Sequence, residues 1–155
     1  MSEEKIKKYK RETEDYYKSI KEIYCPYFGD KITFNAKGLE HLKFKRKNHA
    51  RSVDDQLIRL KLFNLAPEVL SLSKTLQGVS SRRVFESVRT NSRSEYKMVD
   101  AEYFEFVAIL KNIRVKVVVK QIGNSPKYFW SIIPFWKISK NKNKKKMHSG
   151  NPEED

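Results

Sequence analysis

The pattern of apolar residues changes character near residue 80, and this change limits most strongly the folds open to the chain. Before it, apolar residues recur at helical spacing, as in Val53, Leu57 and Leu60. After it, apolar and polar residues alternate along segments 103–110, 114–120 and 127–133, which is typical of strands. Short loops separate these strands, and residues 84–90 form a weaker strand candidate. Helices first and an antiparallel meander last predict an α+β fold.

The N-terminal half contains several predicted helices. The whole chain is expected to divide into three regions. Residues 2–23 read as a charged helix with a thin apolar stripe that packs on the domain, and Pro26 ends it. Residues 27–34 are expected to form a strand or hairpin with its turn at Gly29. Asn35 is the expected N-cap of a short helix and Ser52 that of the next. The predicted regions are a charged helix at 1–23, one domain at 24–136 and a disordered basic tail at 137–155.

The charge of the chain predicts a polyanionic partner. The 155 residues carry a formal net charge of +14, and 34% of them are charged. Nucleic acid is the commonest partner of so basic a protein. The other source of the excess is a genome whose base composition favours Lys and Asn codons. Hydrophobic residues make up only 39%, but nine Phe and eight Tyr still allow a core.

Cysteine usage and hydropathy predict a soluble cytoplasmic protein. Cys25 is the only cysteine, so neither a disulfide framework nor a thiolate zinc site is expected. The N-terminus lacks the apolar core of a secretory signal, and no apolar run is long enough to span a bilayer. No membrane association, metal or cofactor is therefore expected.

The segment from Lys37 to Arg51 is the strongest candidate for chemistry. It places His41 and His49 on either side of a basic cluster, and Arg51 closes it. The cluster consists of Lys43, Lys45, Arg46 and Lys47. Imidazole exchanges protons near neutral pH, and Lys and Arg bind phosphate. A metal-free ribonuclease needs both, whereas a simple nucleic-acid-binding surface, or a solvated face, needs only the cations. The spacing of the two histidines does not match a metal site.

The predicted strands add further candidates. Alternation in 114–120 places Lys116 and Lys120 on one face and the valines on the other, and the valine face is expected to pack on the helices. Ser131 is a candidate phosphate contact, or a small residue that fills the sheet surface. Tyr128 and Trp130 are candidates for stacking on bases, or core residues.

The order of these elements resembles a known superfamily of nucleases. The segments that carry the resemblance are KGLEHLKFKRKNHAR, FEFVAIL, RVKVVVKQI and KYFWSIIPFW. The chain resembles phage- and mobile-element-borne nucleases of the barnase/EndoU/colicin/RelE-like superfamily. The resemblance covers roughly residues 24–136. It implies N-terminal helices packed on a four-stranded antiparallel sheet, and a metal-independent endoribonuclease that acts as a toxin on tRNA or mRNA.

The resemblance also implies roles for individual residues. His41 corresponds to the helical histidine, His49 and Arg51 to the second basic position, and Ser131 to the Ser or Thr of the final strand. Lys120 is the weakest match. In this hypothesis one imidazole takes the proton of the RNA 2′-hydroxyl and the other protonates the leaving oxygen. The cations stabilise the phosphoryl charge, and a neutralising antitoxin or immunity protein is an expected partner.

Two other functions are compatible with the same residues. A non-catalytic RNA- or DNA-binding module would use Lys43, Lys45, Arg46, Lys47, Lys116, Lys120 and Tyr128 without turnover. A protein-interaction accessory of a mobile element would dock through the N-terminal helix. The sequence leaves these alternatives open.

Overall fold

The computed structural model describes residues 2–135 and 149–155. Its first element is helix α1 (Glu3–Ile20), whose N-cap Ser2 accepts a hydrogen bond from the Lys5 amide at 3.3 Å. The helix ends earlier than residue 23, because Lys21 adopts a positive φ of 62° and leads into a strand. It buries Tyr17 against the core.

A hairpin follows the first helix. Strands β1 (Glu22–Cys25) and β2 (Asp30–Thr33) pair antiparallel. Gly29 lies in the turn with a φ of 60°, as expected, but the first strand comes before Pro26 rather than after it.

Three helices and a small hairpin complete the N-terminal half. Helix α2 (Ala36–Lys43) precedes the strands β3 (Phe44–Arg46) and β4 (His49–Ala50), which pair only with each other. Helix α3 (Val53–Leu62), the short 3₁₀ turn η1 (Phe63–Leu65) and helix α4 (Ala66–Leu72) follow. Asn35 and Ser52 cap α2 and α3 through their side chains, which confirms both predicted N-caps.

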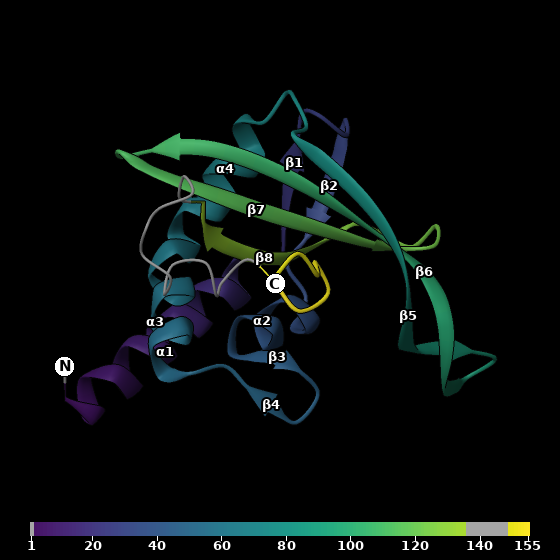
Figure 1. Ribbon diagram of the computed structural model, residues 1–155, viewed down its shortest axis with the longest axis horizontal. Helices are drawn as coiled ribbons and strands as arrows, with labels where there is room; N and C mark the ends of the chain where they lie inside the picture. Colours follow the sequence, from purple (N-terminus) through teal and green to yellow (C-terminus); the bar gives the residue numbers. More distant parts are fainter. Residues whose placement is uncertain (1, 136–148) are drawn as a thin grey trace.

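Four long strands form the C-terminal half. They are β5 (Gly78–Thr90), β6 (Arg93–Leu110), β7 (Ile113–Ile122) and β8 (Tyr128–Pro134). They pair antiparallel in chain order, with β5 on β6, β6 on β7 and β7 on β8. Since β7 pairs only with residues 101–110 of β6, the rest of the β5–β6 hairpin extends beyond the sheet. We call residues 83–100 the β5–β6 arm, and Figure 1 shows it curving away from the body.

The expectation of a four-stranded antiparallel sheet is wrong. The structure has a six-stranded mixed sheet in the order β1-β2-β8-β7-β6-β5. The hairpin β1–β2 extends the sheet because β2 lies parallel to β8, with Thr33 opposite Tyr128. The pairing joins segments almost a hundred residues apart, so local sequence patterns could not predict it. The broader α+β layout, with helices early and strands late, is compatible with the structure.

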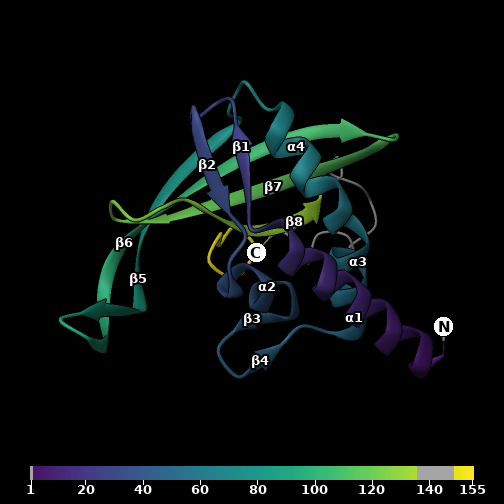
Figure 2. The same cartoon turned by 180° about the vertical axis from the view of Figure 1, so that it is seen from behind.

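The two faces of the sheet have different coverings. One face carries Phe106, Val117 and Phe129 and packs on residues of α1, α3 and α4 in the main core. The opposite face carries a smaller cluster around Tyr103, Tyr128 and Trp130. Figures 1 and 2 show the helices α1 and α4 behind the sheet in the first view and residues 149–155 on its other side. The candidate site lies on this second face.

Candidate anion-binding site

Helix α2 brings His41 against the sheet. The helix approaches β8 closely at Gly38, where a side-chain Cβ would lie 2.5 Å from the Tyr17 hydroxyl. This contact turns the imidazole of His41 onto the indole of Trp130, with ring centroids 3.8 Å apart and an interplanar angle of 15°. His41 is 4% exposed. A histidine that the sequence placed beside a basic run is therefore part of the interior.

The environment of His41 keeps its imidazole neutral. Burial lowers the pKa of His41 well below 6.5, and the charges of Arg51, Arg59 and Lys120 lower it further. A hydrogen bond with the main chain of Asp155 opposes this shift. The Nη2 of Arg51 lies 3.0 Å from His41 Nε2, and because guanidinium nitrogens can only donate, Nε2 is the acceptor.

Two arginines line the site: Arg51 lies just before α3 and its N-cap, and Arg59 lies within the helix. Arg51 Nε donates to the main-chain oxygen of His41 at 2.9 Å. Arg59, which is 1% exposed, pairs with Asp55 at 2.6 Å and donates to Ser131 Oγ at 2.7 Å. Burial lowers the pKa of Arg51 to about 10, with a further contribution from the charge of Arg59. Arginine remains charged at neutral pH despite such a shift, so both supply positive charge.

Lys120 is a buried cation on the same face. Its side chain is 0% exposed, and Nζ lies 2.9 Å from Glu86 and 2.7 Å from Glu153. The ammonium also lies 4.0 Å from the centre of the Trp130 ring, close enough for a cation–π interaction. The sequence predicted that Lys116 and Lys120 look outward. The face is as predicted, but both side chains are buried: Lys116 pairs with Glu105, and residues from 149 to 155 cover Lys120.

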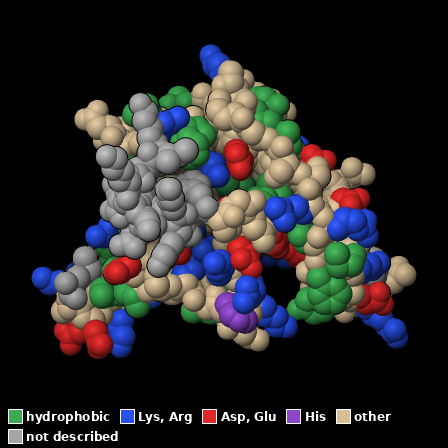
Figure 3. Space-filling model, in the orientation of Figure 1, with side chains coloured by type: hydrophobic (Ala, Val, Ile, Leu, Met, Phe, Trp, Pro, Cys, Tyr) green, Lys and Arg blue, Asp and Glu red, His purple; other side chains and the backbone are tan. Residues whose placement is uncertain are grey.

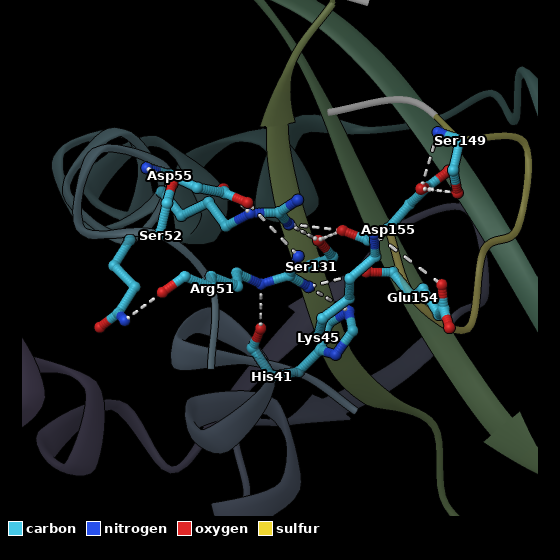
Figure 4. Close-up of polar contacts among 11 residues, drawn as sticks. His41, Lys45, Arg51, Ser52, Asp55, Ser131, Ser149, Glu154 and Asp155 are labelled. Atoms are coloured by element: carbon cyan, nitrogen blue, oxygen red, sulfur yellow. Dashed lines mark hydrogen bonds and ion pairs between the residues drawn. The ribbon is translucent and has the colours of Figure 1, made fainter. Parts of the chain in front are cut away.

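The acidic end of the described chain fills the space between these cations, as Figure 4 shows. The main-chain oxygen of Asp155 accepts hydrogen bonds from Arg59 and from Ser131 Oγ. The carboxylate of Glu153 accepts from Lys120 and from the Tyr103 hydroxyl. Two oxygen-binding positions therefore lie in one buried, positively charged site.

The structure brings some of the predicted site residues together. His41 and Arg51 are in direct contact, and Ser131 joins them through Arg59 and Asp155. Lys120 and Tyr128 lie on the adjoining strands. Trp130, which the sequence left open between base stacking and the core, stacks on His41.

The remaining candidates lie outside the buried site or at its rim. His49 is exposed on β4, and its Nδ1 lies 3.0 Å from the main-chain oxygen of Lys47. Lys43 pairs with Glu14 of α1. Lys45 and Arg46 reach the carboxylate of Glu154, at 4.0 and 2.9 Å. Of the two predicted histidines, the structure thus buries only His41, and the two imidazoles do not face each other.

Sequence reasoning missed Arg59, Tyr103 and Glu86. Arg59 lies between Ile58 and Leu60 in the apolar stripe of its helix, and a charge at such a position was the available signal. Residues 149–155 belong to the predicted disordered tail, yet they pack on the sheet, where Glu153 pairs with the buried Lys120 and the main chain of Asp155 meets the buried Arg59. The rest of that tail, 137–148, lies outside the described residues.

Searches among protein-family models, curated proteins and solved structures find no significant match to this chain. Within residues 2–135 and 149–155, no helix is long and apolar enough to cross a membrane. The same residues hold no group of three or more His, Cys, Asp or Glu side chains placed to bind a metal ion.

Proposed function

We propose that the chain is a metal-independent endoribonuclease whose reaction centre is His41 with Arg51, Arg59 and Ser131. The observation that carries this proposal is the position of the Asp155 main-chain oxygen. It accepts from Arg59 and Ser131 and bonds with the His41 ring, as a phosphoryl oxygen of bound RNA would. Guanidinium groups and a hydroxyl are the donors that phosphate recognition uses.

The proposed reaction is an internal transesterification. The 2′-oxygen attacks the adjacent phosphorus and the bond from phosphorus to the 5′-oxygen breaks, which leaves a 2′,3′-cyclic phosphate and a 5′-hydroxyl. His41 Nε2 takes the 2′-hydroxyl proton once Arg51 turns to the phosphate, and water protonates the leaving 5′-oxygen. Base catalysis of this kind contributes about 10²–10⁴-fold. The positive charges of Arg51 and Arg59 stabilise the phosphoryl oxygens.

The protonation state of His41 fits the role of a base. Its lowered pKa leaves the ring neutral at pH 7. A phosphodiester bound beside it adds negative charge, which favours the protonated ring that forms during the reaction. The acid role expected of a second imidazole does not fit the exposed position of His49.

An exposed aromatic pair supports a nucleic-acid substrate. Phe85 and Tyr96 of the β5–β6 arm stack on each other with centroids 5.2 Å apart, and are 66% and 54% exposed. Lys47 lies 5.3 Å above the Tyr96 ring. Figure 3 shows hydrophobic side chains gathered over the arm with Lys and Arg around them. Such surfaces bind bases by stacking and phosphates by charge.

The second candidate function is nucleic-acid binding without cleavage. It is favoured by the hydrogen bond from Arg51 to His41 Nε2, which uses the imidazole as a structural acceptor. The toxin role and the neutralising partner implied by the resemblance remain predictions, and the fold that it implied is not the one found.

The test of this proposal compares two histidine variants on labelled RNA in EDTA. We expect the wild type and His49→Ala to give fragments with cyclic phosphate ends, and His41→Ala to lose about 10²-fold or more in rate. Circular dichroism establishes that each variant is folded. Equal rates for His41→Ala and the wild type would rule out His41 as the base. Bound but intact RNA in every sample would favour the binding module.

A further inference from the structure

Residues 149–155 make an unusually complete set of polar contacts with the site. Trp130 Nε1 donates to the main-chain oxygen of Pro152 at 2.9 Å, and Arg51 Nη2 donates to that of Glu154 at 2.9 Å. Arg82 reaches the main-chain oxygen of Gly150 at 3.2 Å. We call residues 149–155 the acidic segment, and Figure 4 shows its last residues directed into the site.

The charges of the acidic segment match those of the site. Five cations pair with residues 153–155 or donate to them: Lys45, Arg46, Arg51, Arg59 and Lys120. Two carboxylates from the rest of the described fold, Asp55 and Glu86, pair with members of this set, and Glu86 also pairs with Lys37. The five cations therefore outnumber these two carboxylates, and the acidic segment adds those of Glu153, Glu154 and Asp155. Without the segment this site would be an uncompensated cationic pocket.

The position of Glu153 is a second anion subsite beside the reaction centre. Its carboxylate meets Lys120 Nζ at 2.7 and 3.0 Å and accepts from the Tyr103 hydroxyl. Burial raises the pKa of Tyr103, so the phenol remains a donor. The two subsites lie on either side of Trp130, which contacts His41 with its ring and the acidic segment with its Nε1.

A buried hydroxyl beside this subsite lacks a hydrogen-bond partner among the described residues. Tyr128 is 4% exposed, and its hydroxyl makes no hydrogen bond within the described part of the chain. Tyr128 lies opposite Lys120 in the pairing of β7 with β8. Burial raises the pKa of its hydroxyl, and the charges of Glu86 and Glu153 raise it further. An unsatisfied buried donor lowers the stability of the fold, and a ligand that brings an acceptor would satisfy it.

We propose that the site binds two consecutive phosphates of single-stranded RNA and that the acidic segment is its built-in competitor. The Asp155 oxygen and the Glu153 carboxylate mark the two phosphate positions. A pocket beside Asp155, lined by Arg82 and Lys116 among others, gives the strand room to continue. The inference rests on the proposed function only in taking RNA as the polyanion.

Competition has a measurable consequence for binding. RNA enters only the fraction of molecules whose acidic segment has left the site, so the apparent affinity falls by that fraction. If the segment occupies the site in 90% of molecules or more, its loss improves the apparent Kd about tenfold or more. Lys120 and Arg59 contribute to either bound state.

The test uses a fluorescent 2′-O-methyl oligonucleotide, which binds like RNA but has no 2′-hydroxyl to react. Fluorescence anisotropy measures its Kd for the wild type, for the double variant Glu153→Gln/Glu154→Gln and for a matched control, Glu12→Gln/Glu68→Gln. The control removes two negative charges from exposed positions of α1 and α4, away from the site and the β5–β6 arm. We expect the double variant to bind about tenfold more tightly than the control.

A second measurement examines the segment itself. We expect a chain ending at residue 148 to bind the probe as tightly as the double variant, and a synthetic peptide of residues 149–155 to compete with the probe for it. Equal affinities of the double variant and the control would overturn the proposal. So would a truncated chain that binds the peptide but not the oligonucleotide, since the site would then be one for acidic peptides. Because the probe is not cleaved, these results do not depend on whether His41 is a catalyst.

Discussion

At the scale of single residues, burial decides what the charged side chains of this chain can do. His41, Arg59 and Lys120 are almost fully enclosed, whereas His49, close to His41 in sequence, is exposed. The buried cations act on His41 at short range in a medium of low dielectric constant, and they favour its neutral form. Location in the fold, more than residue type, therefore separates the candidate base from an ordinary surface histidine.

The lowered pKa of His41 predicts a pH-dependent stability. In the unfolded chain the imidazole titrates near 6.5, whereas in the folded chain it stays neutral to a lower pH. The unfolded state therefore binds more protons below pH 6.5, and folding stability falls there as the pH is lowered. We expect the free energy of unfolding to drop by up to about 1.4 kcal/mol per pH unit below 6.5, and His41→Gln to lack this component.

Urea unfolding of the wild type and His41→Gln at pH values above and below 6.5 measures the difference. The quantity compared is the slope of the unfolding free energy against pH. Its absolute value is not compared, because the substitution also alters the stacking on Trp130. His49→Gln serves as the control, because it removes an imidazole from an exposed position outside the buried site. Parallel pH profiles for the wild type and His41→Gln would contradict the assignment of a buried neutral His41.

At the scale of elements, the packing of α2 on β8 positions the site. Gly38 makes two contacts that fix this packing. Its amide donates to Oδ1 of the N-cap Asn35 at 3.1 Å, and its missing side chain allows the helix to reach Phe129 and Tyr17. The Tyr17 hydroxyl donates to the main-chain oxygen of Asn35 at 2.6 Å and fixes α1 to the same point. His41 lies one helical turn further along.

Replacing Gly38 with alanine is expected to destabilise the fold. An added Cβ would lie 2.5 Å from Tyr17 Oη and closer still to the Phe129 carbonyl oxygen, so the helix must shift. Overpacking typically costs about 1–3 kcal/mol, part of which the higher helix propensity of alanine offsets by up to about 1 kcal/mol. The net result is a lower free energy of unfolding, measured by urea denaturation.

Glu40→Ala on the same helix is the matched control, because Glu40 is exposed. It should change the unfolding midpoint little. We also expect Gly38→Ala to weaken RNA binding in parallel with its stability, since the shift displaces His41. An unchanged midpoint for Gly38→Ala would show that α2 does not press on β8 as closely as described.

At the scale of the whole molecule, the cations that give the net charge of +14 fall into two groups with different effects. Some cations pair with acids at the surface, such as Lys31 with Glu22 and Arg83 with Asp100. Others surround the site and the β5–β6 arm. The pairs at the surface contribute little to stability, whereas the cations at the site would each displace a counterion from RNA.

This distribution predicts a steep dependence of RNA binding on salt. If about five cations contact phosphates, the Kd for single-stranded RNA should rise about 100-fold between roughly 50 and 200 mM salt. Fluorescence anisotropy at several salt concentrations gives the slope of log Kd against the logarithm of the salt concentration. Lys120→Met should reduce this slope by about the contribution of one cation. Lys31→Met should leave it unchanged, because Lys31 lies on β2 and pairs with Glu22 outside the site. A Kd that hardly varies with salt would exclude phosphate contacts as the source of binding.

The sequence by itself determined several of the elements and their order. Alternation predicted residues 103–110 of β6 together with β7 and β8, and the apolar periodicity with Asn35 and Ser52 predicted α2 and α3. These signals are local: a strand or a cap is specified by residues within a few positions of one another. For the same reason the local segment around His41 and Arg51, which do meet, was recognisable as a candidate site.

Only the tertiary structure decided how distant segments meet. The parallel pairing of β2 with β8 made the sheet six-stranded, and the helix α3 brought Arg59 to Ser131. The acidic segment reached Lys120 from beyond the end of the last strand, which turned a face expected to be exposed into a buried site. These contacts depend on complementary charge and shape between segments far apart in the sequence. Periodicity and composition therefore cannot predict which buried cation an acidic residue pairs with.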